Sequence, residues 1–423
     1  MNLTEPQAGS DVGALSTKAT RNDDGTYAIT GSKIFITWGD SDFAENVVHL
    51  VLARLPDGGK GTKGISLFVV PRNIPDENGE PGVANSLNVV SLEHKMGIHG
   101  SPTAVMQYDG ATGWLVGEEH DGMKCMFTMM NNARLGVGGQ GVGVAEGAYQ
   151  HALAYALERK QGRTPLGEGT IVDHADVRRM LATMKAETFA ARAIALECAL
   201  AIDMGQASGS KEWKARAAFL TPIAKAFGTD TGVKVADLGI QIHGGMGFVE
   251  ETGAAQYARD VRILPIYEGT TAIQANDLLG RKVLRDGGET ARRFAELIKE
   301  TETALAQGAS ALQQIAQGLG RARRAFEDGL AAMLDMAGQD ANAAYAASVP
   351  FLMLTGTLAS GWQLGRAALA AQTALDRGET PAFMAQKIAT ARFYAQHILV
   401  ETETERARIL AGSASVLDEG HQI

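Results

Sequence analysis

The sequence has 423 residues, of which 45% are hydrophobic and 21% are charged. Its length indicates about two to four domains, and its composition excludes a disordered or fibrous protein. Acidic residues (48) outnumber lysine and arginine (39), and this balance argues against a general nucleic-acid partner.

Neither secretion nor membrane insertion is indicated. Residues 1–5 show neither a basic start nor an apolar run. The uncharged stretch 341–365 is long enough to span a bilayer, but its polar residues and Pro350 favour two buried helices. Two cysteines are too few for a disulfide framework, so we expect a reducing compartment, by default the cytoplasm.

The first part of the chain is predicted to form antiparallel strands. Segments 46–52 and 64–70 are apolar and β-branched, and Pro71 ends the second one. A turn sequence at 21–25 separates two further extended segments. We therefore expect a β-barrel-like domain over residues 1–115.

The remainder is predicted to be helical. Ala-, Leu- and Met-rich segments at 142–160 and 177–204 indicate an all-α helical-bundle domain over 116–283. A further helical region is expected over 284–423, where Ala291, Phe294 and Ile298 fall at helical spacing. The resulting class is a multi-domain α+β fold, not the alternating pattern of a doubly wound sheet.

Two glycine-rich motifs suggest other chemistry but lack its context. Residues 136–141 satisfy the dinucleotide pattern G-x-G-x-x-G, but no strand precedes them, so close packing of helices is favoured. Residues 243–247 are similar to an esterase oxyanion loop, but no G-x-S-x-G nucleophile motif occurs. The nine histidines show no metal-ligand spacing, and no metal site is predicted.

Three segments carry stronger signals of a functional site. Residues 3–11 form a Pro-containing loop able to present backbone N–H groups and hydroxyls, although an ordinary turn fits too. Residues 29–38 have a strand pattern that ends in an aromatic, aliphatic and hydroxyl cluster suited to lining a flat ring; an ordinary core strand is the alternative. In residues 266–274, Glu268 lies in an apolar run, where desolvation favours a base near neutral pH; a salt-bridged or exposed glutamate is the alternative.

Together these segments, in this order, resemble the acyl-CoA dehydrogenase flavoprotein family. They match its T-E-P-x-A-G-S-D loop, its I-x-G-x-K-x-x-I-T strand and its Y-E-G-T-x-x-I-Q segment. Two further matches are residues 95–103 and the Q-I-H-G-G-M-G segment at 241–247. The long C-terminal part is similar to a subgroup represented by the bacterial 3-(methylthio)propanoyl-CoA dehydrogenases.

The resemblance implies that the chain oxidises an acyl-CoA thioester to the trans-2-enoyl-CoA with FAD as cofactor. Glu268 is then the base that takes the α proton, and its backbone N–H polarises the thioester carbonyl. Some members place the base beside the arginine that matches Arg134. Here that position is Ala133, which cannot accept a proton. Glu268 is therefore the one candidate that the family pattern offers.

The remaining site residues are also carried over from the family motifs. The residues matched to cofactor contacts are Leu3, Thr4, Ser10, Phe35, Ile36, Thr37 and Thr270, with Arg159, Gln241, Gly244 and Gly245 reaching the FAD of a neighbouring subunit. The residues matched to substrate contacts are Ser10, Asn131, Arg134 and Gly269. Gly162 stands where the family has a phenylalanine, which leaves the local adenine contact open.

Partners follow from the same resemblance. We expect an electron-transfer flavoprotein as electron acceptor and a homodimer or homotetramer. The family has a helical domain ahead of the first motif, so we expect a chain truncated at its N-terminus and weakly active. The alternatives are an inactive remnant acting as an interaction protein and an acyl-CoA oxidase. The identity of the acyl group is not predicted.

Overall fold

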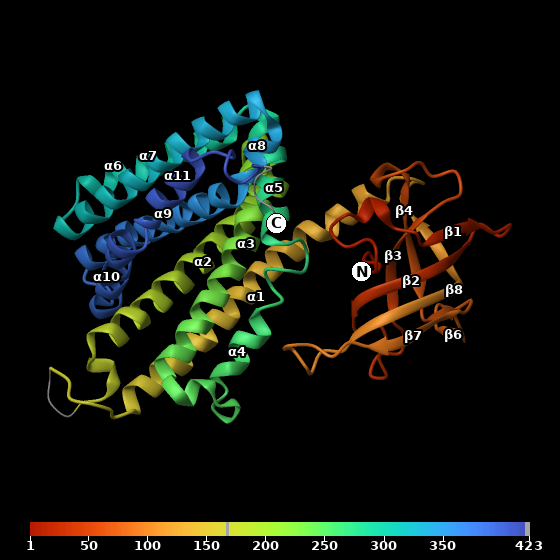
Figure 1. Cartoon of the computed structure of the whole chain (residues 1–423), viewed down its shortest axis with the longest axis horizontal. Helices are drawn as coiled ribbons and strands as arrows, with labels where there is room; N and C mark the ends of the chain where they lie inside the picture. Colours follow the sequence, from red (N-terminus) through yellow and green to blue (C-terminus); the bar gives the residue numbers. More distant parts are fainter. Residues whose placement is uncertain (166–168, 419–423) are drawn as a thin grey trace. The chain divides into compact units, whose positions relative to one another are not determined.

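The structure is a computed structural model that describes residues 1–165 and 169–418. The chain forms two compact units, Met1–Asn132 and Ala133–Ile423, which we call the β unit and the helical unit (Figure 1). Helix α1, Gly122–Glu158, begins in the first unit and continues into the second.

The β unit is built from eight strands in the described part of the chain. They are β1 (Lys18–Arg21), β2 (Tyr27–Thr37), β3 (Val48–Arg54), β4 (Ile65–Pro71), β5 (Asn73–Pro75), β6 (Pro81–Ala84), β7 (Leu87–Leu92) and β8 (Thr103–Val116). Six of them form one sheet in the order β2-β1-β3-β4-β8-β7, and β5 pairs with β6 separately. Because β2 also pairs with β8, the sheet closes into a small barrel.

The pairing is antiparallel except between β1 and β3. Alternate residues along the strands point inward, and Ile29, Phe68 and Tyr108 are buried in the core of the barrel. A bulge between Lys33 and Ile36 interrupts the pairing of β2 with β8. It lies at the end of β2 where the sequence predicts cofactor contacts, and bulges commonly redirect side chains at such places.

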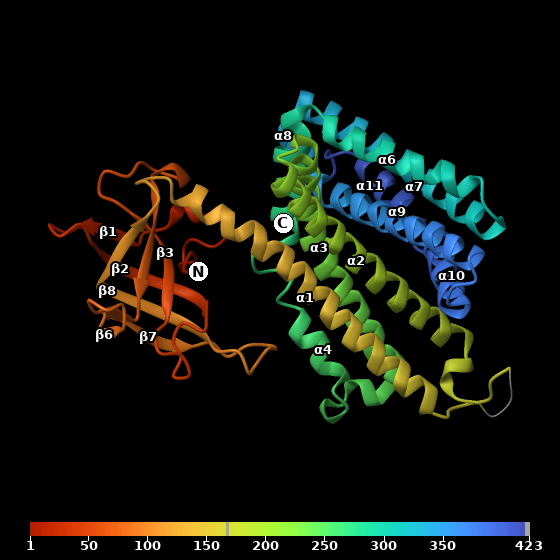
Figure 2. The same ribbon diagram turned by 180° about the vertical axis from the view of Figure 1, so that it is seen from behind.

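The helical unit continues with α2 (Ala175–Ser208), α3 (Lys211–His243), α4 (Ala254–Val261), α5 (Thr271–Asp277), a π-helical turn η6 (Leu278–Val283), α6 (Glu289–Ala306), α7 (Ser310–Gln339), α8 (Ala341–Ala346), α9 (Ser348–Asp376), α10 (Pro381–His397) and α11 (Glu401–Leu410). Short 3-10 turns occur at Val12–Ala14, Thr62–Gly64, Ile171–Asp173, Gly244–Phe248, Glu250–Thr252 and Leu284–Asp286. Helices α2 and α3 lie side by side, and α9 lies against α2, α7 and α10 (Figures 1 and 2).

One large apolar core joins the C-terminal helices to α2 and α3. Ile194 on α2 and Phe219 on α3 belong to the same buried cluster as Phe294 on α6 and Trp362 on α9. The rings of Phe219 and Phe294 are 5.3 Å apart, and those of Phe294 and Trp362 are 5.4 Å apart. The helices after residue 283 therefore pack as part of the helical unit.

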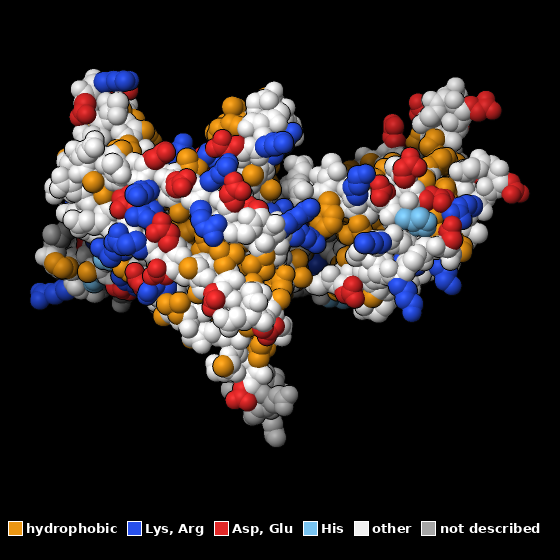
Figure 3. All heavy atoms as spheres, turned by 90° about the horizontal axis from the view of Figure 1, so that it is seen from above, with side chains coloured by type: hydrophobic (Ala, Val, Ile, Leu, Met, Phe, Trp, Pro, Cys, Tyr) orange, Lys and Arg blue, Asp and Glu red, His pale blue; other side chains and the backbone are white. Residues whose placement is uncertain are grey.

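Ion pairs reinforce this packing at two places. Glu197 on α2 pairs with Arg216 on α3 and with Arg366 on α9. Lys234 on α3 lies 2.7 Å from Glu187 on α2 and 3.3 Å from Glu401 on α11. On the face shown in Figure 3, basic and acidic side chains of the larger unit lie interspersed.

The predicted fold class is confirmed: a β-barrel-like domain is followed by helical-bundle regions. The predicted domain boundaries at residues 115 and 283 stay predictions. The compact units of the structure, Met1–Asn132 and Ala133–Ile423, are two in number and do not test a division into three domains. Stretch 341–365 forms α8 and most of α9, with Pro350 in the first turn of α9. Within the described ranges, no helix is both long and apolar enough to cross a bilayer.

The glycine pattern at 136–141 lies inside α1, so the helix predicted from residue 142 begins twenty residues earlier, at Gly122. A Cβ atom on Gly138 would lie 2.4 Å from the carbonyl oxygen of Ala224, and one on Gly141 would lie 2.3 Å from that of Gly228. These glycines let α1 approach α3 closely. The predicted packing role is confirmed, and a dinucleotide loop at this position is excluded.

Candidate active site

Glu268 lies in the segment between α4 and α5 of the helical unit. Its φ angle is 54° and that of Gly269 is 95°, so two successive residues are left-handed. A non-glycine residue is strained in the left-handed region, and the surrounding contacts must offset that conformational cost. Glu268 therefore lies in a turn outside the helices. Thr270, two residues later, caps α5: its hydroxyl accepts a hydrogen bond from the Ile273 N–H.

Lys225 on α3 holds this segment at both ends. Its Nζ donates to the carbonyl oxygen of Leu264 at 2.8 Å and to that of Gly269 at 2.7 Å. The lysine has no exposed surface. One buried ammonium thus joins the residues that stand four before and one after Glu268.

Further hydrogen bonds close the same turn. The side-chain amide of Gln274 donates to the carbonyl oxygens of Glu268 at 3.2 Å and Gly269 at 3.4 Å. The backbone N–H of Thr271 donates to the carbonyl oxygen of Pro265 at 3.1 Å. No described residue accepts a hydrogen bond from the backbone N–H of Glu268, so this donor is available to a ligand.

The electrostatic surroundings suit a proton acceptor. Burial raises the pKa of Glu268, while the positive charges of Arg134 and Lys225 act in the opposite direction. Burial lowers the pKa of Lys225 to about 8. Asp230, whose own pKa is raised by burial, accepts from the Thr271 hydroxyl at 3.3 Å. The predicted desolvation of Glu268 is confirmed by these surroundings.

Arg134 is committed to a buried ion pair. Its Nη1 lies 2.9 Å from Oδ2 of Asp277, and the two side chains are only 4% and 7% exposed. Asp277 also pairs with Arg281, which is 58% exposed. The family resemblance implies that Arg134 holds CoA. This assignment stays a prediction, as does that of Asn131, which is exposed on α1.

In the β unit, the loop at residues 1–11 is fixed by a second buried lysine. Nζ of Lys33 lies 2.8 Å from the Glu5 carboxylate and 3.0 Å from the carbonyl oxygen of Leu3. Burial pushes the pKa of Glu5 upward, but Lys33 and hydrogen bonds from Thr17 and Ser16 outweigh it and hold that pKa at about 2. These contacts hold the loop in one conformation against the barrel.

The end of β2 lies beside this loop, since the Ile34 N–H donates to the Thr4 carbonyl oxygen. Phe35 is 60% exposed at a φ angle of 60°, Ile36 is buried, and Thr37 is exposed. The hydroxyls of Thr4, Ser10 and Thr37 have no hydrogen-bond partner among the described residues. An exposed ring beside unpaired hydroxyls fits a cofactor with a flat ring system and polar edges, such as FAD.

The residues predicted to reach a neighbouring subunit's cofactor gather at one end of the helical unit. Arg159 follows the last turn of α1, and Gln241 lies in the last turn of α3. The Tyr155 ring stacks on His243, with centroids 4.4 Å apart, which brings these two helix ends together. Gly244 has a φ angle of 61° and ends α3, and Gly245 follows it; both are exposed.

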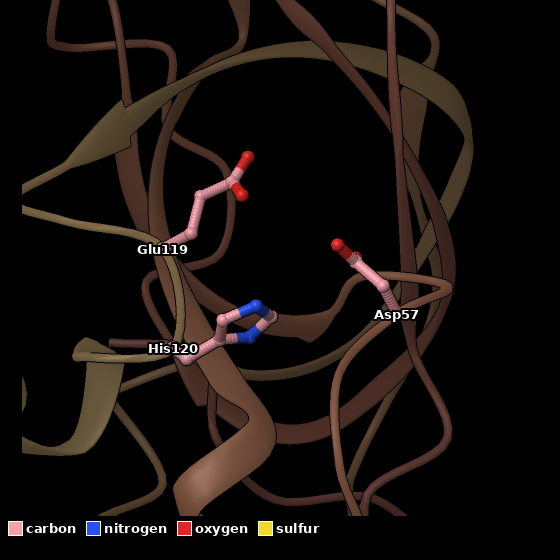
Figure 4. Close-up of side chains that lie close together, drawn as sticks. All are labelled: Asp57, Glu119 and His120. Carbon is pink, nitrogen blue, oxygen red and sulfur yellow. The ribbon is translucent and has the colours of Figure 1, made fainter.

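A group of potential metal ligands lies elsewhere in the β unit. The side chains of Asp57, Glu119 and His120 point toward a common space (Figure 4). Both carboxylates already pair with Arg21, at 3.0 Å and 2.6 Å. One guanidinium bridges the two carboxylates and offsets part of their negative charge, so ion pairing with Arg21 accounts for their closeness.

Three segments of the chain match the sequence models of three domain families. The acyl-CoA dehydrogenase middle domain matches residues 1–111, and the acyl-CoA dehydrogenase C-terminal domain matches residues 120–283. An acetyl-CoA dehydrogenase C-terminal-like domain matches residues 294–419. The chain is 57% identical to the 3-methylmercaptopropionyl-CoA dehydrogenase of Ruegeria pomeroyi, over 99% of this chain and 72% of that one.

The chain belongs to the acyl-CoA dehydrogenase family. It is also 40% identical to the broad-specificity linear acyl-CoA dehydrogenase FadE5 of Mycobacterium tuberculosis, over 94% of this chain and 70% of that one. The crystal structure of an acyl-CoA dehydrogenase from Bacillus anthracis, complexed with FAD, has the same fold. It superposes with a TM-score of 0.78 at 24% identity, covering 97% of this chain and 68% of that one.

Sequence reasoning missed two residues of this acyl-CoA dehydrogenase that contact the candidate site. Lys225 carried a signal, because it is a lone cation in the apolar run Ile223 to Phe227, where a lysine needs buried partners. Asp277 carried none, since its partner Arg134 is 143 positions away.

Proposed function

We propose that this acyl-CoA dehydrogenase performs the FAD-dependent α,β-dehydrogenation of an acyl-CoA thioester, with Glu268 as the base. The observation that carries the proposal is a carboxylate with a raised pKa on a turn fixed by Lys225 and Gln274. A carboxylate poised closer to neutral pH is a better proton acceptor than one at its usual pKa. The likeness to relatives of known activity gives the reaction class.

In this proposal, Glu268 accepts the α proton of the thioester. The unpaired backbone N–H of Glu268 donates to the thioester carbonyl and stabilises the negative charge that develops there. The left-handed backbone at Glu268 keeps its carboxylate and its backbone N–H available at the same place. Gly269, which has no side chain, would let the substrate approach closely. Arg134 and Lys225 limit the rise in the pKa of Glu268, so the base stays ionised over a useful pH range.

FAD would be held by Leu3, Thr4 and Ser10 of the first loop, by Phe35, Ile36 and Thr37, and by Thr270. When bound, FAD supplies the chemistry of hydride acceptance. Arg159, Gln241, Gly244 and Gly245 would contact the cofactor of a second copy of the chain, which makes the active form a homodimer or homotetramer. The exposed side chains of Ser10, Thr37 and Phe35 support this assignment.

We propose 3-(methylthio)propanoyl-CoA as the first substrate to test, because it corresponds to the relative with 57% identity. The relative with 40% identity acts on linear acyl-CoA thioesters, so a series of straight-chain acyl-CoAs is the proper comparison. An electron-transfer flavoprotein is proposed as the acceptor. An oxygen-electrode trace without peroxide release during turnover supports that acceptor, and rapid peroxide release favours an oxidase instead.

The decisive experiment replaces Glu268 with Gln and mixes the FAD-bound protein with acyl-CoA without oxygen. The isosteric amide cannot accept the proton, so the flavin absorbance is expected to stay unbleached while FAD remains bound. Glu251→Gln is the matched control, because Glu251 is an exposed glutamate in the 3-10 turn Glu250–Thr252, and it should bleach normally. Undiminished bleaching in Glu268→Gln would defeat the assignment, and a protein that stays colourless after incubation with FAD would favour a non-catalytic role.

A further inference from the structure

We propose that Lys225 is the positioning residue of the base: it ties the Leu264 and Gly269 carbonyls together and thereby holds Glu268 in its left-handed turn. This inference rests on the proposed function for its catalytic meaning, but the clamp itself is a property of the fold. Lys225 stands on α3, and the clamped carbonyls lie 39 and 44 positions along the chain from it.

The geometry leaves little freedom in the clamped segment. The two contacts of Lys225 Nζ are 2.8 Å and 2.7 Å, both in the range of strong charge-assisted hydrogen bonds. Gln274 supports the same turn from α5, and a Cβ on Gly269 would lie 2.6 Å from its side-chain nitrogen. The left-handed residues are therefore held from α3 on one side and from α5 on the other.

The choice of residue is informative, because a fully buried lysine is costly unless it is paired. No described carboxylate forms an ion pair with Lys225; its recorded hydrogen bonds go to the two backbone carbonyls instead. A neutral donor or an apolar side chain would satisfy packing at a lower desolvation cost. A cation kept at this position also acts on Glu268, since its charge favours the ionised carboxylate.

Charged groups that interact with Glu268 or with Lys225 remain in place when Lys225 is changed. Arg134 from α1 favours the ionised form, and Asp230 on α3 interacts with Lys225 itself. Arg262, after α4, interacts with Asp230. Because Arg134 is held by Asp277, it stays in place, and the loss of Lys225 removes one of the cations that oppose the effect of burial. The pKa of Glu268 should then rise further.

The first test measures the clamp without catalysis. Hydrogen exchange is followed at residues 264–271 in Lys225→Met and in the control Lys234→Met. The control removes another lysine of α3, whose ion-pair partners are Glu187 and Glu401 and lie outside this segment. Exchange is expected to be at least about tenfold faster in Lys225→Met, as for loss of one charge-assisted hydrogen bond, and unchanged in Lys234→Met.

The second test measures flavin reduction by acyl-CoA without oxygen, as a function of pH. In Lys225→Met the limiting rate is expected to fall by about 10- to 100-fold, the scale expected for a misplaced catalytic group. Substrate affinity and FAD content should stay close to wild type. The acid limb of the profile should also move to higher pH, because a base with a higher pKa loses its ionised form sooner; a merely structural tie would leave that limb in place.

Lys225→Gln keeps two N–H donors without the charge and serves if Lys225→Met does not fold. It should show the same movement of the acid limb with a smaller increase in exchange. Unchanged exchange in the folded variants would overturn the clamp. Faster exchange with an unshifted limb and unchanged rate would overturn its role toward Glu268. If Glu268→Gln still bleaches while exchange accelerates in Lys225→Met, the base assignment fails and the clamp stands.

Discussion

Arg134 and Asp277 form a buried ion pair between α1 and the end of α5, with 2.9 Å between Nη1 and Oδ2. The pair links the helix that carries the packing glycines to the segment that follows Glu268. Because Asp277 also accepts from the exposed Arg281, one carboxylate has a buried partner and a surface partner. The contributions of its two ion pairs to the free energy of unfolding can therefore be measured separately.

Asp277→Ala is expected to lower the free energy of unfolding by about 3–5 kcal/mol, because it leaves the buried Arg134 charge without its carboxylate. Arg281→Ala removes the exposed partner of the same carboxylate and should cost at most about 1 kcal/mol. Urea unfolding of the two variants provides the comparison. Equal losses in the two variants would contradict this ranking.

The pH dependence of flavin reduction should reflect the raised pKa of Glu268. A base is active when ionised, so the rate should fall as pH drops through a pKa that lies above the usual glutamate value of 4.5. Stopped-flow measurements between pH 4 and 8 would locate this limb. The exposed Glu251→Gln variant should keep it in place, whereas a limb at or below 4.5 would argue against a desolvated base.

Glu5→Gln is expected to destabilise the β unit by about 3–5 kcal/mol at neutral pH, since it leaves Lys33 buried without its counter-charge. The pKa of Glu5 is about 2 in the folded protein and 4.5 ordinarily, so its contribution is complete above 4.5 and is lost as pH falls toward 2. Urea unfolding at decreasing pH should therefore bring wild type and variant together. Asp11→Asn, exposed in the same loop, should show no such convergence.

Gly138→Ala is expected to cost about 1–3 kcal/mol, because its Cβ would lie 2.4 Å from the Ala224 carbonyl oxygen and force α1 away from α3. Gly139, one position further, has open space around it. Gly139→Ala should stabilise the helix by about 0.5–1 kcal/mol. Thermal unfolding of the pair measures the contrast, and equal behaviour of both variants would exclude tight α1–α3 packing.

The sequence predicted what local patterns determine. The β-branched runs became β3 and β4, and the helical spacing of Ala291, Phe294 and Ile298 became the buried face of α6. Glu268 stood out because an isolated carboxylate in an apolar run needs an explanation. The family motifs directed attention to Phe35, whose left-handed backbone no residue pattern had indicated.

Contacts between distant segments were beyond local patterns. Lys225 gave a hint through its apolar neighbours, but its partners lie 39 and 44 positions away, and only the folded chain identifies them. The continuity of α1 through six residues that include four glycines was also missed. Glycine weakens an isolated helix, and tertiary packing against α3 overrides that preference here.

The core shared between α2, α3 and the last helices limits how this chain could be shortened. Ending it near residue 283 would place Ile194 and Phe219 in water, together with the rest of the apolar face that α6 and α9 now cover. A shorter enzyme of this design would need polar side chains at those positions, or another subunit seated over them. Trimming the tail and re-surfacing the two helices are thus one engineering problem rather than two.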